Sequence, residues 1–154
     1  MQQMSLRFNR DVLTQLDHVD YVMVMGGNND VLWRGRHPNQ CLEDLESPFL
    51  QIQKANAKVI ALEILPVTIK WGLFTHKNKR LNYLRETNLG IHALGKKMGI
   101  PVVNLYDPLA DAKKTGLNRL YDSGDGEHLS VEGYKKVGHV IFTSFLQNLF
   151  RFQA

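Results

Sequence analysis

The sequence contains a single cysteine, Cys41, among 154 residues. One cysteine cannot form an intramolecular disulfide, so the fold has to be stable without covalent cross-links, as is typical of proteins from a reducing compartment. No apolar run approaches the roughly 18 residues that a membrane-spanning helix needs. No N-terminal stretch has the charged and then apolar form of a signal peptide. We therefore expect a soluble protein, cytoplasmic or otherwise intracellular.

Clusters of metal ligands and of basic residues are also lacking. The six histidines are scattered, with no pair at a ligand spacing and no cysteine partners, so we expect no metal site. Lysine and arginine outnumber aspartate and glutamate by 19 to 15, which gives a net charge of +4. The densest basic stretch, His76 to Arg80, is typical of a solvated helix start. Without a basic stripe or an aromatic stacking motif, nucleic acid is not an expected partner.

Segments with strand and helix patterns alternate along the chain. Three apolar runs predict buried strands over residues 21–25, 58–65 and 100–105. Apolar residues at helical spacing predict helices over residues 6–16, 42–56, 79–98 and 131–150. Ser47-Pro48 marks either the start of the second helix or a kink in it, and the aperiodic residues 31–41 indicate a loop. The alternation predicts one α/β domain over residues 1–154, with three layers and a parallel sheet.

Glu63 interrupts the most continuous of the apolar runs. A carboxylate inside a sheet that is covered on both faces is costly unless it has a partner. Glu63 is therefore expected either to be paired or to lie at the exposed end of its strand.

A carboxylate and an imidazole lie three residues apart in the stretch Asp125-Gly126-Glu127-His128, directly before the predicted last helix. An aspartate at this spacing can hold the ring of His128 in one tautomer and stabilise its protonated form, as a general base in acyl transfer requires. Taken alone, the same residues are more typical of a turn followed by an ordinary polar histidine.

A second motif, Gly26-Gly27-Asn28-Asn29-Asp30, follows the first predicted strand. Open α/β sheets bind their ligands at the carboxyl ends of their strands, and a side-chain amide at such a place can donate to an oxyanion. Glycine and asparagine also tolerate positive φ, so this stretch by itself indicates no more than a turn.

Together the two motifs resemble those of the SGNH hydrolases, also called the GDSL esterase and lipase family. That family has a Gly-x-Asn-Asp block after a central strand, matched by Gly27 to Asp30, and an Asp-x-x-His block before its last helix, matched by Asp125 to His128. The resemblance implies a three-layer, flavodoxin-like sandwich that cleaves acyl esters without a cofactor.

The resemblance also implies a role for each matched residue. His128 is the expected general base, Asp125 the carboxylate that orients it, Asn29 the oxyanion donor and Gly27 the residue that shapes the turn. A register one residue earlier would make Asn28 the amide donor. We prefer Asn29 because its register keeps all three motif residues.

The family's N-terminal Gly-Asp-Ser block, which supplies the nucleophile, has no counterpart in this chain. Ser5 lies about where a second family block would end, and we expect it to cap the first helix rather than to replace the nucleophile. Without the family's first strand, residues 21–25 would present an apolar sheet edge that is prone to association. We therefore expect that the chain either pairs with a second copy across that edge or is a fragment of a longer protein that supplies strand and serine.

The leading functional hypothesis is an SGNH-type ester hydrolase module that acts on a small acyl ester by a Ser-His-Asp mechanism, with its serine unassigned. In such an enzyme, Trp33 could wall the substrate pocket, and Arg34 or Arg36 could face an anionic group. The alternative is a catalytically silent relative that keeps the pocket and binds a ligand or a partner.

Overall fold

The computed structural model describes residues 2–14, 18–68 and 77–146 of the chain. These residues form two compact units. One comprises Met1–Ile64 with Asn78–Val102, and the other comprises Leu65–Lys77 with Val103–Ala154. The single domain expected over residues 1–154 stays a prediction.

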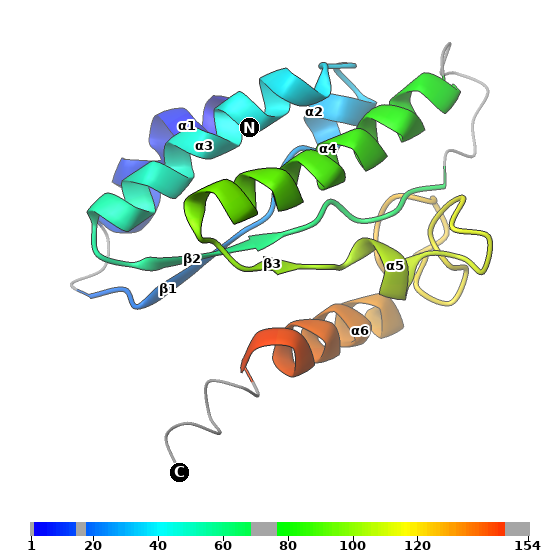
Figure 1. Ribbon diagram of the computed structural model, residues 1–154. Coiled ribbons are helices and arrows are strands. Elements are labelled where there is room, and N and C mark those ends of the chain that lie inside the picture. The colour runs from blue at the N-terminus through cyan, green and yellow to red at the C-terminus, as the bar shows by residue number, and fades with distance from the viewer. Residues whose placement is uncertain (1, 15–17, 69–76, 147–154) are drawn as a thin grey trace. The chain divides into compact units, whose positions relative to one another are not determined.

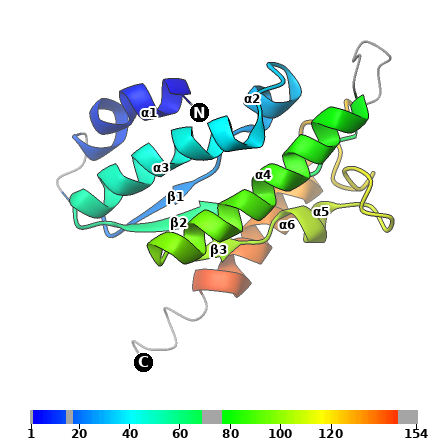
Figure 2. The ribbon, with the colours of Figure 1, turned by 45° about the horizontal axis from the view of Figure 1, so that its top comes forward.

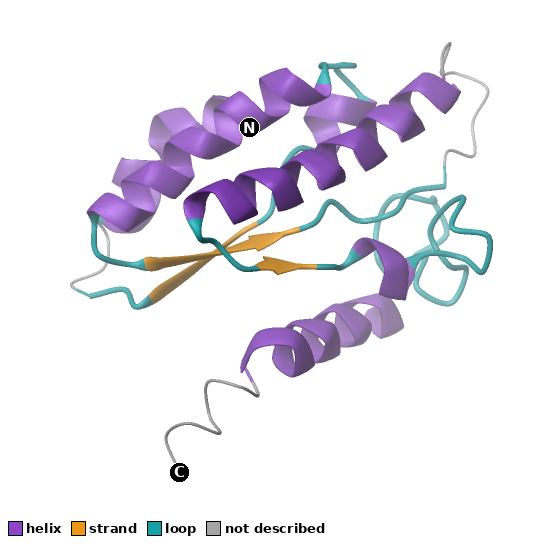
Figure 3. Ribbon diagram, viewed as in Figure 1, coloured by secondary structure: helices purple, strands orange, loops and turns teal. Residues whose placement is uncertain are grey.

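Three strands form the sheet, in the order β1 (Tyr21–Val24), β2 (Lys58–Leu62) and β3 (Val102–Val103) (Figure 3). β1 runs parallel to β2, with Tyr21 opposite Lys58 and Val24 opposite Ala61. All of β2 except Lys58 is buried, as expected for a strand covered on both faces. The three strands, the parallel sheet and the α/β class are thus as predicted from the apolar runs.

β2 ends three residues before its predicted end because a side chain takes over its backbone hydrogen bonds. The side-chain Nδ2 of Asn88 donates to the carbonyl oxygen of Ile64, and its Oδ1 accepts from the Ile64 N–H, both at 2.9 Å. A buried backbone N–H or carbonyl group needs a hydrogen-bond partner. Here Asn88, a residue of the helix that packs on the sheet, is the partner of both backbone groups of Ile64. The pattern of apolar residues along the chain could not predict that the Asn88 side chain would replace strand pairing at Ile64.

Helices α1 (Gln2–Phe8), α3 (Pro38–Lys54) and α4 (Lys77–Met98) lie on one face of β1 and β2 (Figures 1 and 2). α1 continues as a π-helix, η1 (Asn9–Leu13), and the short helix α2 (Asn28–Leu32) follows β1. The almost fully buried side chains of α3, β2 and α4 include Leu45, Phe49, Ile52, Ile60, Leu84 and Ile91. Among the described residues, no helix combines the length and the hydropathy that crossing a membrane requires.

The start of α3 differs from the prediction. The helix begins at Pro38, where His37 and Gln40 form a capping box, and it runs through Pro48 without a break. Pro48 is neither the start nor the end of the helix, because the buried stripe continues on both sides of it and outweighs the backbone hydrogen bond that a proline removes. The expected loop over residues 31–41 therefore contains the end of α2 and the start of α3. Ser5 also lies inside α1, so the expectation that it caps this helix is wrong.

The second unit contains the short helix α5 (Tyr106–Leu109), the helix α6 (Val131–Ile141) and the π-helix η2 (Phe142–Leu146). Ser130 caps α6, since its hydroxyl oxygen accepts from the Gly133 N–H at 3.1 Å and its hydroxyl donates to the Leu120 carbonyl at 2.8 Å. The predicted helix start at Val131 is confirmed. The last residues of the predicted helix, beyond Leu146, lie outside the described part of the chain.

Candidate active site

The Asp125–His128 turn brings the predicted dyad into direct contact. Nδ1 of His128 lies 2.6 Å from Oδ2 of Asp125. The other carboxylate oxygen of Asp125 accepts the backbone N–H groups of Glu127 and His128, each at 2.8 Å. Both oxygens of Asp125 are thereby fixed, and the carboxylate can hold the imidazole in a single orientation.

Glycines and a second aspartate build the turn that carries the dyad. Oδ1 of Asp122 accepts from the N–H groups of Gly124 and Gly126, both at 2.8 Å. These two glycines have φ of 121° and 88°, values that a residue with a side chain adopts only under strain. The Ser123 N–H donates to the carbonyl oxygen of His128 at 2.9 Å and closes the loop. The glycines that bound the sequence motif therefore have a geometric function.

The charges of the dyad reinforce each other. The N–H groups of His128 and Glu127, together with the imidazole, hold the pKa of Asp125 well below its usual range. The hydrogen bond from Asp125 in turn raises the pKa of His128. Because Asp125 holds the proton on Nδ1, Nε2 is the basic nitrogen of the ring. This is the arrangement that a general base needs.

Replacing Asp125 by asparagine is expected to lower the pKa of His128, because the neutral amide no longer stabilises the imidazolium. The imidazolium then loses its proton at a lower pH than in the unchanged protein. Titration of the His128 ring by NMR measures this shift directly and does not depend on catalysis. Glu127→Gln is the matched control, since the charge of Glu127 raises the pKa of His128 less than Asp125 does. An unmoved titration in Asp125→Asn would show that the contact does not control the ring.

The Gly-Asn loop belongs to the other unit and lies at the carboxyl end of β1. Gly27 is buried and has φ of 112°, so it makes the sharp turn from the strand into α2. Its carbonyl oxygen accepts from the Val31 N–H at 2.9 Å. The carbonyl oxygen of Asn29 accepts from the N–H groups of Trp33 and Arg34, both at 3.1 Å. Asn29 is exposed and Asn28 is half-buried, so the side chain of Asn29 is accessible to a ligand.

Asp30 anchors this loop. The sequence analysis had not predicted this role for Asp30. Its side chain is 6% exposed, and Oδ1 lies 3.5 Å from Nη1 of Arg34 and 3.6 Å from Nη1 of Arg36. Arg36 also pairs with Asp44 of α3, and its N–H donates to the Asp30 carbonyl at 2.9 Å. Both arginines thus contact carboxylates of the chain itself. The sequence analysis had suggested that one of them could face an anionic group of a substrate. In the sequence, the only sign of this anchor was that Asp30 is the last residue of the Gly-x-Asn-Asp motif.

Glu63 is paired. This was one of the two expectations for it, the other being a place at the exposed end of its strand. The residue is 5% exposed, and its Oε1 lies 2.7 Å from Nε2 of His92 on α4. His92 follows Glu63 by 29 positions, and no motif in the sequence connected the two. In the parts of the chain that the structure describes, no group of three or more histidine, cysteine, aspartate or glutamate side chains could hold a metal ion.

The five serines do not supply an evident nucleophile. Ser130 uses its hydroxyl as the cap of α6, and Ser47 accepts from the side chain of Gln51. Ser5 and Ser144 lie within helical segments, and Ser123 contacts His128 through the backbone. Within the unit that carries His128, none of the described serines, Ser123, Ser130 and Ser144, has its hydroxyl hydrogen-bonded to the His128 ring.

Comparison with known proteins identifies one family whose model covers both the Gly27–Asp30 motif and the Asp125–His128 motif. A model of the GDSL-like lipase/acylhydrolase family matches residues 1–136. A GDSL-like lipase from Bacteroides thetaiotaomicron has 25% sequence identity and a TM-score of 0.81, over 95% of this chain and 70% of that one. No curated protein sequence matches.

Two further solved structures share the fold at lower identity. The lipase/acylhydrolase from Enterococcus faecalis has 23% identity and a TM-score of 0.69, over 90% of this chain and 66% of that one. A catalytic mutant of an acetylxylan esterase from Geobacillus stearothermophilus has 16% identity and a TM-score of 0.73, over 92% and 65%. The chain therefore belongs to the GDSL-like lipase/acylhydrolase family, the SGNH hydrolases, and has their flavodoxin-like α/β fold.

Proposed function

We propose that the chain is an ester hydrolase module that acts on a small acyl ester and needs no cofactor. The observation that carries the proposal is the contact between Nδ1 of His128 and Oδ2 of Asp125, in a turn that fixes both oxygens of the carboxylate. Membership of a lipase and acylhydrolase family gives this contact a chemical context. An intracellular location also stays a prediction.

In the proposed reaction His128 takes a proton from the attacking nucleophile and later returns it to the leaving alcohol. Asp125 keeps the ring in the tautomer that leaves Nε2 basic and stabilises the imidazolium that forms. Asn29 donates its side-chain N–H to the oxyanion of the tetrahedral intermediate, and Gly27 sets the turn that presents Asn29. The nucleophile is expected to be a serine, and its identity is left to experiment.

A catalytically silent binding module is the second candidate. It is favoured by one observation within the unit that carries His128, namely that no hydroxyl of its described serines, Ser123, Ser130 and Ser144, is hydrogen-bonded to the His128 ring. A protein of this kind would keep the fold and the dyad, and would bind an ester or a partner without cleaving it.

A fluorophosphonate probe distinguishes the two candidates. A chain that has an activated serine is expected to gain one probe adduct per molecule in intact-mass analysis, and peptide mapping then identifies the serine. The adduct should be lost in His128→Ala and retained in His139→Ala, a variant of an exposed histidine on α6. A folded protein that gains no adduct would contradict the hydrolase proposal and support the silent module.

A further inference from the structure

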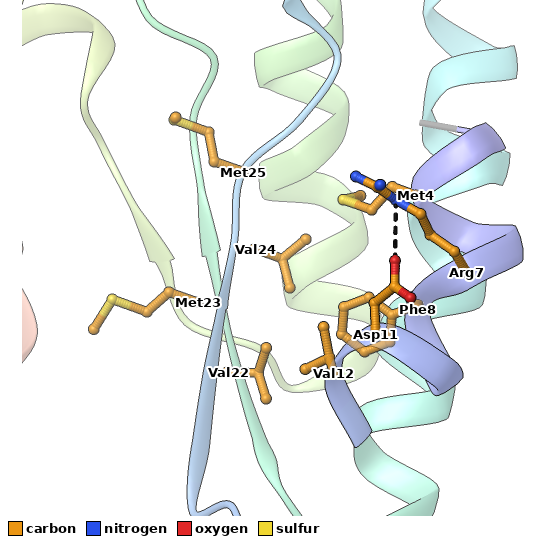
Figure 4. Close-up of a pocket in the computed structure, with 9 residues that line it drawn as sticks. All are labelled: Met4, Arg7, Phe8, Asp11, Val12, Val22, Met23, Val24 and Met25. Carbon is orange, nitrogen blue, oxygen red and sulfur yellow. Dashed lines mark ion pairs between the residues drawn. The ribbon is translucent and has the colours of Figure 1, made fainter. Parts of the chain in front are cut away.

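The proposed oxyanion donor, Asn29, lies on α2, a helix of five residues. Isolated helices shorter than about 12 residues are marginal in water, so α2 depends on contacts with the rest of the fold. Next to β1, residues of α1, η1 and the strand line a cavity of about 440 Å³ (Figure 4), and none of its described lining residues belongs to α2. Contacts that hold α2 come from two other helices, α3 and α4.

The contact with α3 is made through the residue that follows Asn29. The carboxylate of Asp30 is buried, and Arg36 places its guanidinium between this carboxylate and that of Asp44 on α3. The backbone N–H of Arg36 also donates to the carbonyl oxygen of Asp30 at 2.9 Å. A buried carboxylate is costly unless it is paired. Arg36 therefore binds both the side chain and the backbone of the residue next to Asn29, and ties them to α3.

The contact with α4 is made at the other end of α2. Nη1 of Arg80 donates to the carbonyl oxygen of Leu32 and, at 3.4 Å, to that of Val31. The last carbonyl groups of a helix have no partner within the helix, and a cationic side chain is favourable there. Gly35 has φ of 63°, and a Cβ at this position would lie 3.2 Å from Nη1 of Arg80, so the guanidinium lies against the backbone after α2. Arg80 thus holds the end of α2.

We propose that Arg36 and Arg80 are positioning residues for Asn29. They act through α2, which they hold against α3 and α4, so that the Asn29 amide keeps its place when the oxyanion forms. This inference rests on the proposed function, in which Asn29 is the oxyanion donor. Such a donor is effective because its position is fixed before the reaction, and a misplacement of about 1 Å can lower a rate by about a hundredfold.

A double-mutant cycle with Asn29 tests the proposal. Arg36→Met removes the charge, and kcat should fall by about tenfold with a smaller change in KM. In an Asn29→Ala protein the same substitution should change kcat by less than about twofold, because no donor is left to position. A loss of equal size in both backgrounds would overturn the proposal. A rise in KM with kcat unchanged would overturn it as well, since Arg36 would then bind the ester itself.

Three further variants complete the cycle. Arg80→Met should behave as Arg36→Met does, and it takes its place in the cycle if circular dichroism shows that Arg36→Met is unfolded. Arg36→Lys keeps a positive charge between the two aspartates and should recover part of the lost kcat. Lys97→Ala is the matched control, because it removes a different ion pair between α4 and α3, the one with Glu46. It should leave kcat within a factor of about two.

Amide hydrogen exchange tests the same contacts without hydrolysis. The N–H groups of Trp33 and Arg34 both donate to the carbonyl oxygen of Asn29 at 3.1 Å, so their exchange reports on the opening of α2. Exchange of both should be about tenfold faster or more in Arg36→Met and Arg80→Met, and unchanged in Lys97→Ala. If the unchanged protein hydrolyses no ester, the proposed function fails, and these exchange rates still decide whether the arginines hold α2. Exchange that neither arginine variant alters would overturn the inference.

Discussion

Replacing His128 by alanine is expected to lower kcat for short acyl esters by about a thousandfold or more, because removal of one member of a catalytic triad disables the others. The fold should be unaffected, since the His128 side chain is largely exposed and its hydrogen bond is made with Asp125, three residues away. Steady-state hydrolysis of p-nitrophenyl acetate measures the rate, and circular dichroism measures the fold.

His139→Ala is the matched control for this variant. His139 is an exposed histidine of the same unit, on α6, and its backbone carbonyl accepts from the Thr143 hydroxyl and the Phe142 N–H. Its removal is expected to leave kcat within a factor of about two, as surface substitutions usually have small effects. Equal activity of His128→Ala and the unchanged protein would remove the role assigned to His128. An unchanged protein without measurable hydrolysis would remove the enzyme assignment altogether.

Replacing Asn29 by alanine is expected to lower kcat by about a hundredfold or more, with a smaller change in KM. An oxyanion donor is used chiefly in the transition state, and the loss of one such donor in a serine hydrolase has an effect of this size. The exposed position of Asn29 after the Gly27 turn makes its side chain available for this role. Rates should be measured with the same ester as for His128.

Asn28→Ala separates the two registers of the motif. The two asparagines are neighbours at the start of the same short helix, α2, where Asn28 is half-buried and Asn29 is exposed, so circular dichroism should accompany both rates. With Asn29 as the donor, Asn28→Ala should retain most of the activity. The reverse pattern, a loss in Asn28→Ala with activity kept in Asn29→Ala, would assign the donor to the earlier register.

Predictions that depended on neighbouring residues agreed well with the structure. The members of the dyad are three residues apart, and the turn that carries them contains Gly124 before Asp125 and Gly126 after it, both with positive φ. The start of α6 at Val131 follows from the cap by Ser130, and the three strands follow from their apolar runs. Each of these features is determined by a few consecutive side chains and their backbone preferences.

The sequence reading was less accurate where a local signal and tertiary packing disagreed. Ser47-Pro48 suggested either the start of a helix or a kink, and it is not the start, because α3 begins at Pro38 and the stripe that includes Leu45 and Phe49 is buried on both sides of the proline. β2 was expected to extend to residue 65, but Asn88 of α4 takes over the backbone of Ile64. In both cases the packing of a helix on the sheet outweighs a preference of the local chain.

The sequence by itself determined the α/β class and the family, because these follow from patterns of adjacent or regularly spaced side chains, and the residues of the proposed chemistry stay predictions from the same patterns. Only the tertiary structure decided that Asp30 is paired with Arg36, that His92 is the partner of Glu63, and that residues of α1 and β1 line a cavity. Such partners are brought together by the way the helices pack on the strands. Their separation along the chain follows no repeat that a sequence pattern could reveal.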